Sequence, residues 1–90
     1  MIFLITYDLN KPAQEYPKLY EAIMNLGAWW HHLDSTWVVN TTLKAQDVFN
    51  QLKQCIDQND RLLIINITNQ ERQGWLPPEA WQWLIDAETE

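Results

Sequence analysis

The sequence predicts an α+β domain whose elements follow the order strand, helix, strand, strand, helix, strand, with a short aromatic helix at the C-terminal end. Two observations carry this prediction. Unbroken apolar runs near residues 2–7 and 62–67 are typical of strands that are buried on both faces. Between them, two stretches repeat apolar residues with the period of an amphipathic helix. A chain of 90 residues is long enough for one such domain and too short for two.

The first helix is expected over residues 16–26. Pro17 suits the first turn, where its missing N–H has no helical partner to lose. Gly27 follows as a residue free to end the helix with a positive φ angle. The expected apolar stripe consists of Leu19, Ile23 and Leu26.

A hairpin and a second helix follow. Residues 28–33 and 36–40 are rich in aromatic and β-branched side chains, and the pair Asp34-Ser35 between them is a turn signal. The second helix ends at the polar run 57–60. Its expected apolar face consists of Val48, Phe49, Leu52, Cys55 and Ile56.

This order predicts a ferredoxin-like βαββαβ sandwich over residues 1–69. We expect the two most apolar strands, the first and the last, to lie side by side at the centre of the sheet. Right-handed crossovers then place both helices on one face, expected to be the face of Phe3, Ile5 and Tyr7. The other face of the first strand is also apolar, so it too needs a cover, which a second subunit would supply.

Residues 70–90 are expected to form a separate segment that packs on the domain or on a dimer partner. Pro78 can open a short helix, with Leu76 and Trp81 at the spacing of a hydrophobic staple. Six tryptophans are many for one small core. Trp75 and Trp81 are therefore expected to be mostly buried, against the sheet or against the second subunit.

The charge balance argues against some partners. Six Lys and Arg face twelve Asp and Glu, for a net charge of −6, whereas nucleic acids and anionic membranes bind clustered cations. The short apolar start of the chain has no basic leader, so we expect neither a signal sequence nor a membrane span. A single cysteine, Cys55, permits no internal disulfide. These features predict a cytoplasmic protein.

Three short motifs carry a family resemblance. They are Ile5-Thr6-Tyr7-Asp8-Leu9, the hairpin run from His32 to Trp37, and the run from Asn59 to Ile64. With these motifs the chain resembles the CRISPR-associated protein Two family and the related virulence-associated protein D toxins over about residues 1–68. It is similar above all to uncharacterised bacterial proteins of this superfamily, which share Trp29-Trp30-His31 and the Trp75-Leu76…Glu79-Ala80-Trp81 pattern.

The resemblance implies a ferredoxin-like homodimer. Some members of the family cleave RNA or DNA with a metal ion, using an aspartate that matches Asp8, and others are non-catalytic scaffolds on DNA. In the family, the serine that matches Ser35 packs near this aspartate. The present chain departs from the pattern because it is acidic and lacks the arginine-rich segment that usually follows the first strand.

Asp8 and Ser35 are the candidate catalytic residues, and Asp8 is also the candidate metal ligand. A carboxylate at the end of a buried strand can bind Mg²⁺ with waters in the remaining positions, and a two-fold axis would bring two copies of Asp8 together. The alternative is that Asp8 and Ser35 serve the turns in which they lie. His31 and His32 point to opposite faces of a strand and cannot share a metal.

Two functions remain open from the sequence. The first is a homodimeric, metal-dependent endonuclease that acts on RNA or DNA through Asp8. The second is a non-catalytic homodimeric module that binds a protein partner. The position of Asp8 and the resemblance favour the first, and the acidic charge and the many tryptophans favour the second.

Overall fold

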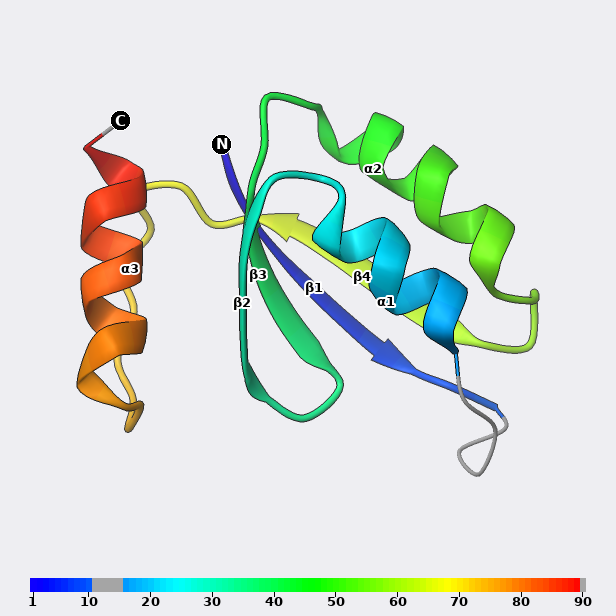
Figure 1. Cartoon of the computed structure of the whole chain (residues 1–90), viewed down its shortest axis with the longest axis horizontal. Coiled ribbons are helices and arrows are strands. Elements are labelled where there is room, and N and C mark those ends of the chain that lie inside the picture. Colours follow the sequence, from blue (N-terminus) through cyan, green and yellow to red (C-terminus); the bar gives the residue numbers. More distant parts are fainter. Residues whose placement is uncertain (11–15, 90) are drawn as a thin grey trace.

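The computed structural model describes residues 1–10 and 16–89, and these form a four-stranded antiparallel sheet with three α-helices (Figure 1). The strands are β1 (Ile2–Asp8), β2 (Ala28–Leu33), β3 (Thr36–Asn40) and β4 (Arg61–Asn66). The helices are α1 (Pro17–Met24), α2 (Ala45–Leu52), which a 3-10 turn η1 (Lys53–Cys55) extends, and α3 (Pro78–Glu88). The predicted α+β class and the predicted order of elements are confirmed.

The strands lie in the order β2-β3-β1-β4, and every neighbouring pair is antiparallel. β1 pairs with β4 from Phe3 opposite Asn66 to Asp8 opposite Arg61, so the first and last strands are neighbours, as expected. The expectation that both lie at the centre of the sheet is wrong for β4, which forms an edge.

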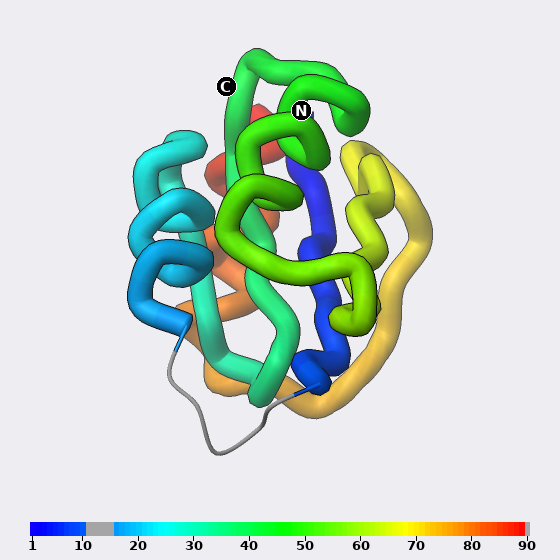
Figure 2. Tube along the Cα trace, turned by 90° about the vertical axis from the view of Figure 1, so that its right-hand side faces the viewer, coloured from blue at the N-terminus to red at the C-terminus, as the bar shows by residue number. Residues whose placement is uncertain are grey.

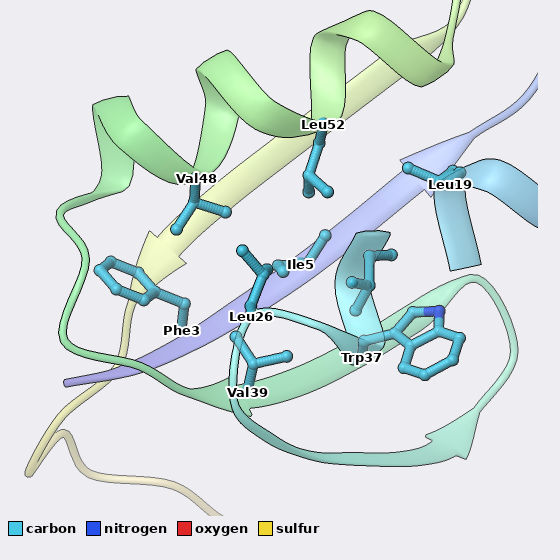
Figure 3. Packing of buried hydrophobic residues seen from close by; sticks show 9 residues of the cluster. Phe3, Ile5, Leu19, Leu26, Trp37, Val39, Val48 and Leu52 are labelled. Carbon is cyan, nitrogen blue, oxygen red and sulfur yellow. The ribbon is translucent and has the colours of Figure 1, made fainter. Parts of the chain in front are cut away.

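One face of the sheet packs against α1 and α2. Phe3 and Ile5 of β1 point to this face and are fully enclosed, which confirms the expected face of the first strand. Figure 3 shows the cluster between α2 and the sheet. Its buried members are Phe3, Ile5, Leu19, Ile23, Leu26, Trp37, Val39, Val48 and Leu52. The predicted stripe of the first helix is therefore buried, and so are Val48 and Leu52 of the second, whereas the assignment of Phe49 to that buried face is wrong because Phe49 is 40% exposed.

The opposite face is covered in part by α3, which lies on the other side of the sheet from α1 and α2 (Figures 1 and 2). Ala80 and Leu84 of α3 are buried against Trp30 of β2. The indole Nε1 of Trp30 donates a hydrogen bond of 3.1 Å to the carbonyl oxygen of Ala80. The chain thus supplies a cover that the expectation had assigned mainly to a second subunit.

Two expected helix features are different in the structure. α1 ends at Met24, two residues before the expected end, and Asn25 follows as its C-cap. Gly27 has the expected positive φ, 157°, but it lies two residues beyond the C-cap Asn25 and directly before β2 rather than at the end of the helix. A Cβ atom at Gly27 would overlap the backbone oxygen of Asn40, which explains why only glycine fits where β2 begins beside β3.

Two expectations about burial are wrong. Only one side of β4 is covered: Leu62 and Ile64 pack on the α2 side, while Leu63 and Ile65 are 53% and 44% exposed. The reason is the edge position, where α3 does not reach. Trp75 is fully exposed, because it precedes the staple residue Leu76 and points away from the groove that Leu76 lines.

Candidate functional site

A cavity of about 650 Å³ opens where β1 ends, between α1 and the β2–β3 hairpin. In Figure 1 this region lies below α1, between the hairpin and the arrowhead of β1. Because β1 and β3 are antiparallel, the end of β1 meets the start of β3, and this brings Asp8 and Ser35 to one cavity. Its lining residues are Tyr7, Asp8, Leu9, Tyr20, Met24, His31, Asp34, Ser35 and Trp37.

Asp8 is the last residue of β1, and its side chain is exposed. Its cross-strand partner is Arg61, the first residue of β4. Oppositely charged residues in such a position attract each other weakly when solvent surrounds them. Asp8 is thus available at the rim of the cavity, as the sequence predicted for a residue at the end of a buried strand.

Ser35 holds the turn of the hairpin. Its φ of 55° lies in the left-handed region, which supports a turn role for this residue. Its carbonyl oxygen accepts hydrogen bonds from the backbone N of Tyr7 at 3.1 Å and from Oγ1 of Thr6 at 3.2 Å. The backbone of Ser35 therefore fixes the hairpin against the end of β1, while its exposed side chain stays at the cavity.

The back wall of the cavity is aromatic. Trp37 is buried, and its ring stacks on that of His31 with a centroid distance of 3.9 Å and an interplanar angle of 6°. Tyr20 of α1 stacks on Trp37 at 6.2 Å. The indole Nε1 of Trp37 donates a hydrogen bond of 3.1 Å to the hydroxyl of Tyr7. Side chains from four elements thus form one connected wall.

Burial raises the pKa of the Tyr7 hydroxyl above its ordinary value of 10.0. The hydrogen bond from Trp37 opposes this effect, whereas the neighbouring Tyr20 and the negative charge of Asp34 add to it. Tyr7 is therefore a neutral, fixed group at physiological pH.

The orientation of His31 follows from its hydrogen bond. Its Nδ1 lies 2.9 Å from the carbonyl oxygen of Thr36. A carbonyl oxygen only accepts, so Nδ1 carries the hydrogen, and Nε2 is an acceptor when the ring is neutral. His32 makes an edge contact with Trp30 at 5.0 Å, in the cluster beneath α3. The two histidines thus lie on opposite faces of the sheet, as expected.

The part of the chain that the structure describes contains no group of three or more His, Cys, Asp or Glu side chains that could hold a metal ion. The cavity offers the carboxylates of Asp8 and Asp34. Mg²⁺ often binds through one or two carboxylates and keeps several waters, so these residues suit such a site without enclosing it. The predicted Mg²⁺ ligand Asp8 stays a prediction.

The sequence had not pointed to the walls of this cavity. Tyr20 and Met24, one helical turn apart on α1, line it, and Tyr7 and Trp37 complete its back. The only signal in the sequence was the spacing of four between Tyr20 and Met24, beside the buried stripe. Which side of a helix meets a cavity depends on packing that this spacing does not encode.

A second exposed feature lies on the face that α3 half covers. Leu63 and Ile65 of β4 are exposed there, beside Leu4 and Thr6 of β1. A groove of about 190 Å³ runs next to them, between α3 and the segment at residues 70–76. Arg72 of that segment forms an ion pair with Glu88 of α3, which ties this layer together.

Comparison with known proteins assigns no role to the cavity or to the exposed side of β4. No protein-family model matches the sequence, and no curated protein matches it. None of the helices in the described residues is long and apolar enough to cross a membrane.

Proposed function

We propose that the chain is a homodimeric interaction module of ferredoxin-like topology, in which a second copy covers the exposed side of β4. The observation that carries this proposal is the half-covered face of the sheet. α3 covers that face over β2 and β3, and leaves the apolar side chains of Leu63 and Ile65 open to solvent. Exposed apolar side chains that lie next to each other are more often found where a protein binds a partner than on the remaining surface.

The topology supports the ferredoxin-like part of the proposal. The antiparallel order β2-β3-β1-β4 is the order that two interlocked β-α-β units produce when one strand of each unit lies between the strands of the other. Both connecting helices, α1 and α2, pack on the same face. The resemblance to the CRISPR-associated protein Two family, carried by the motifs around Asp8 and Asp34, points to the same arrangement.

A second copy is the occupant that the residues favour. β4 is an edge strand, so its outer backbone groups are available to another chain as well as its exposed face. A two-fold contact joins the same patch on both subunits, which suits an apolar patch bordered by Thr6, the cross-strand partner of Leu63. The lone Cys55 fits a reducing compartment such as the cytoplasm.

Sedimentation tests the dimer. We expect the wild-type chain to be a dimer at roughly 10 µM and the Leu63→Glu variant to be a monomer, because a buried carboxylate without a partner is strongly unfavourable. Phe49→Glu is the matched control, because Phe49 is 40% exposed but lies on α2, on the opposite face. A monomeric wild-type chain, or equal dissociation by both variants, would contradict the proposal. Leu63→Glu dimers would place the contact elsewhere and contradict it too.

A metal-dependent nuclease is the second candidate. The observation in its favour is that Asp8 and Ser35, the two residues to which the family resemblance points, line the same cavity as Asp34. In a dimer with its axis near the end of β1, two copies of Asp8 would approach each other and share a cation. Such a site has few cations for phosphate groups, since among the strands that the structure describes Arg61 is the only basic residue paired with the end of β1.

Cleavage of RNA and DNA with and without Mg²⁺ tests this candidate. A nuclease that uses Asp8 loses its Mg²⁺-dependent cleavage in Asp8→Asn and keeps it in Asp47→Asn, a matched change at an exposed residue of α2. Wild-type chain that cleaves neither nucleic acid, or equal cleavage by both variants, leaves the non-catalytic module as the function.

A further inference from the structure

The cavity at the end of β1 supports an inference that depends neither on a dimer nor on catalysis. We propose that it binds a small planar organic cation of the guanidinium or amidinium class. Three properties of the cavity lead to this class, namely its size, the sign of its charge and its flat aromatic wall. A volume of about 650 Å³ lies within the range of small-molecule sites.

The carboxylates of the cavity favour a ligand with a positive charge. Asp8 and Asp34 both line the cavity, and none of the lining residues in the described part of the chain is Lys or Arg. The Tyr7 hydroxyl at the back is neutral, because burial and its partners hold its proton. The net charge of −6 adds a field that attracts cations. An anionic ligand would meet the negative charges of Asp8 and Asp34 here.

The rings decide the shape. One face of the His31 ring lies against Trp37, and because the His31 side chain is exposed, its other face is open to a ligand. A guanidinium group stacks on aromatic faces and is only weakly hydrated, whereas an alkylammonium is compact and strongly hydrated. Met24 offers a polarisable sulfur on the opposite, helical wall. A flat group therefore fits the wall better than a round one.

The cavity also offers hydrogen-bond acceptors to the N–H groups of such a ligand. The in-plane N–H donors of a guanidinium or amidinium group pair with both oxygens of one carboxylate. Asp34 is close enough to the Tyr7 hydroxyl to raise its pKa, so its negative charge reaches the back of the cavity. The Nε2 atom of neutral His31 is a further acceptor. The cavity thus offers acceptors at its rim and a flat apolar wall behind them.

Benzamidine is the probe, and the indole N–H signals of ¹⁵N-labelled protein are the readout. The indole of Trp37 donates to Tyr7 at the back of the cavity, whereas the indole of Trp30 donates to Ala80 on the other face of the sheet. We expect benzamidine to shift the Trp37 signal in a saturable way, with a dissociation constant on the order of 1 mM or lower, and to leave Trp30 unchanged. Benzoate, which has the same shape and the opposite charge, should not shift Trp37. Benzylamine, whose ammonium is not planar, should bind more weakly.

Exposed carboxylates are suitable positions for variants, because their loss does not disturb the core. Asp34→Asn and Asp8→Asn should each weaken benzamidine binding about two- to fivefold. Asp47→Asn on α2 is the matched control and should have no effect. Leu63→Glu should bind as the wild type does, so that a failure of the dimer and a failure of this site are distinguished.

Three results would overturn the proposal. They are a Trp37 signal that does not saturate with benzamidine up to about 10 mM, benzoate binding as tight as benzamidine binding, and unchanged affinity in the variant that carries both Asp8→Asn and Asp34→Asn. The Trp30 indole signal shows in each experiment whether the protein is folded, because its hydrogen bond to Ala80 lies on the other face of the sheet.

Discussion

Two strands of the sheet have nearly the same composition and very different surroundings. β1 (Ile2–Asp8) and β4 (Arg61–Asn66) are both apolar runs, and they pair with each other along their lengths. Ile5 of β1 is fully enclosed, while Ile65 of β4 is 44% exposed. The difference comes from position, since β1 has a strand on each side and Ile5 faces α1 and α2, whereas β4 is an edge strand and Ile65 faces the side that α3 leaves open. Apolar composition therefore predicts a strand, and topology decides how much of it is buried.

The largest expected effect comes from truncating the enclosed strand. Ile5→Ala should lower the free energy of unfolding by about 4 kcal/mol, because it leaves a cavity beneath α1 and α2. Ile65→Ala, the same change on the exposed strand, should cost less than about 1 kcal/mol in a monomer. Urea unfolding measured below the concentration at which the chain associates separates the two. Equal losses would refute the claim that position, not composition, sets burial here.

The next effect concerns the cover that α3 provides. Leu84→Ala should cost about 3 kcal/mol, because Leu84 is buried against the second face of the sheet. Its neighbour Ile85 is 54% exposed, and Ile85→Ala should cost less than about 0.5 kcal/mol. Removal of residues 75–90 should lower the melting temperature further than Leu84→Ala does. An unchanged melting temperature after that removal would mean that α3 does not stabilise the sheet.

The smallest expected effect is seen at alkaline pH. The raised pKa of Tyr7 means that folding holds its proton more tightly than the unfolded chain does, whose tyrosine has a pKa of about 10. This contribution is complete below pH 10 and is lost as the pH rises through the folded pKa. Melting temperatures at roughly pH 9 and pH 11 should therefore fall more for the wild type than for Tyr7→Phe. Identical falls would contradict the pKa shift.

The sequence was sufficient for the order of elements and for the face of β1 that the helices cover. The family resemblance implied that Ser35 lies near Asp8, and in the structure both residues line one cavity. It was not sufficient for the exposure of Leu63 and Ile65, since an edge strand and a central strand can have the same composition.

The tryptophans show the same limit. The staple spacing of Leu76 and Trp81 correctly predicts that α3 starts at Pro78. It does not say where the preceding side chain points, and Trp75 is fully exposed. The cavity wall was missed because Tyr20 and Met24 lie beside the buried stripe of α1, where only packing decides which of them meets a ligand.

Asp60, which is 8% exposed, stands just before β4. Its Oδ1 accepts a hydrogen bond of 2.6 Å from the backbone N of Asn10, and its Oδ2 accepts one of 3.0 Å from the backbone N of Asp57. The carboxylate of Asp60 thus connects the turn before β4 to Asn10. The preceding residue, Leu9, lines the cavity.

This tie gives the molecule an order of assembly. The bond from Asn10 to Asp60 spans 50 positions of the chain, so it closes a long loop late in folding. β1 also meets Arg61 only after the same turn has formed. During synthesis on the ribosome, Asp8 therefore leaves the exit tunnel early but acquires its final surroundings only when β4 follows. All the residues that line the cavity have been synthesised once Trp37 has been added, whereas the pairing of Asp8 with Arg61 waits until about two thirds of the sequence has emerged.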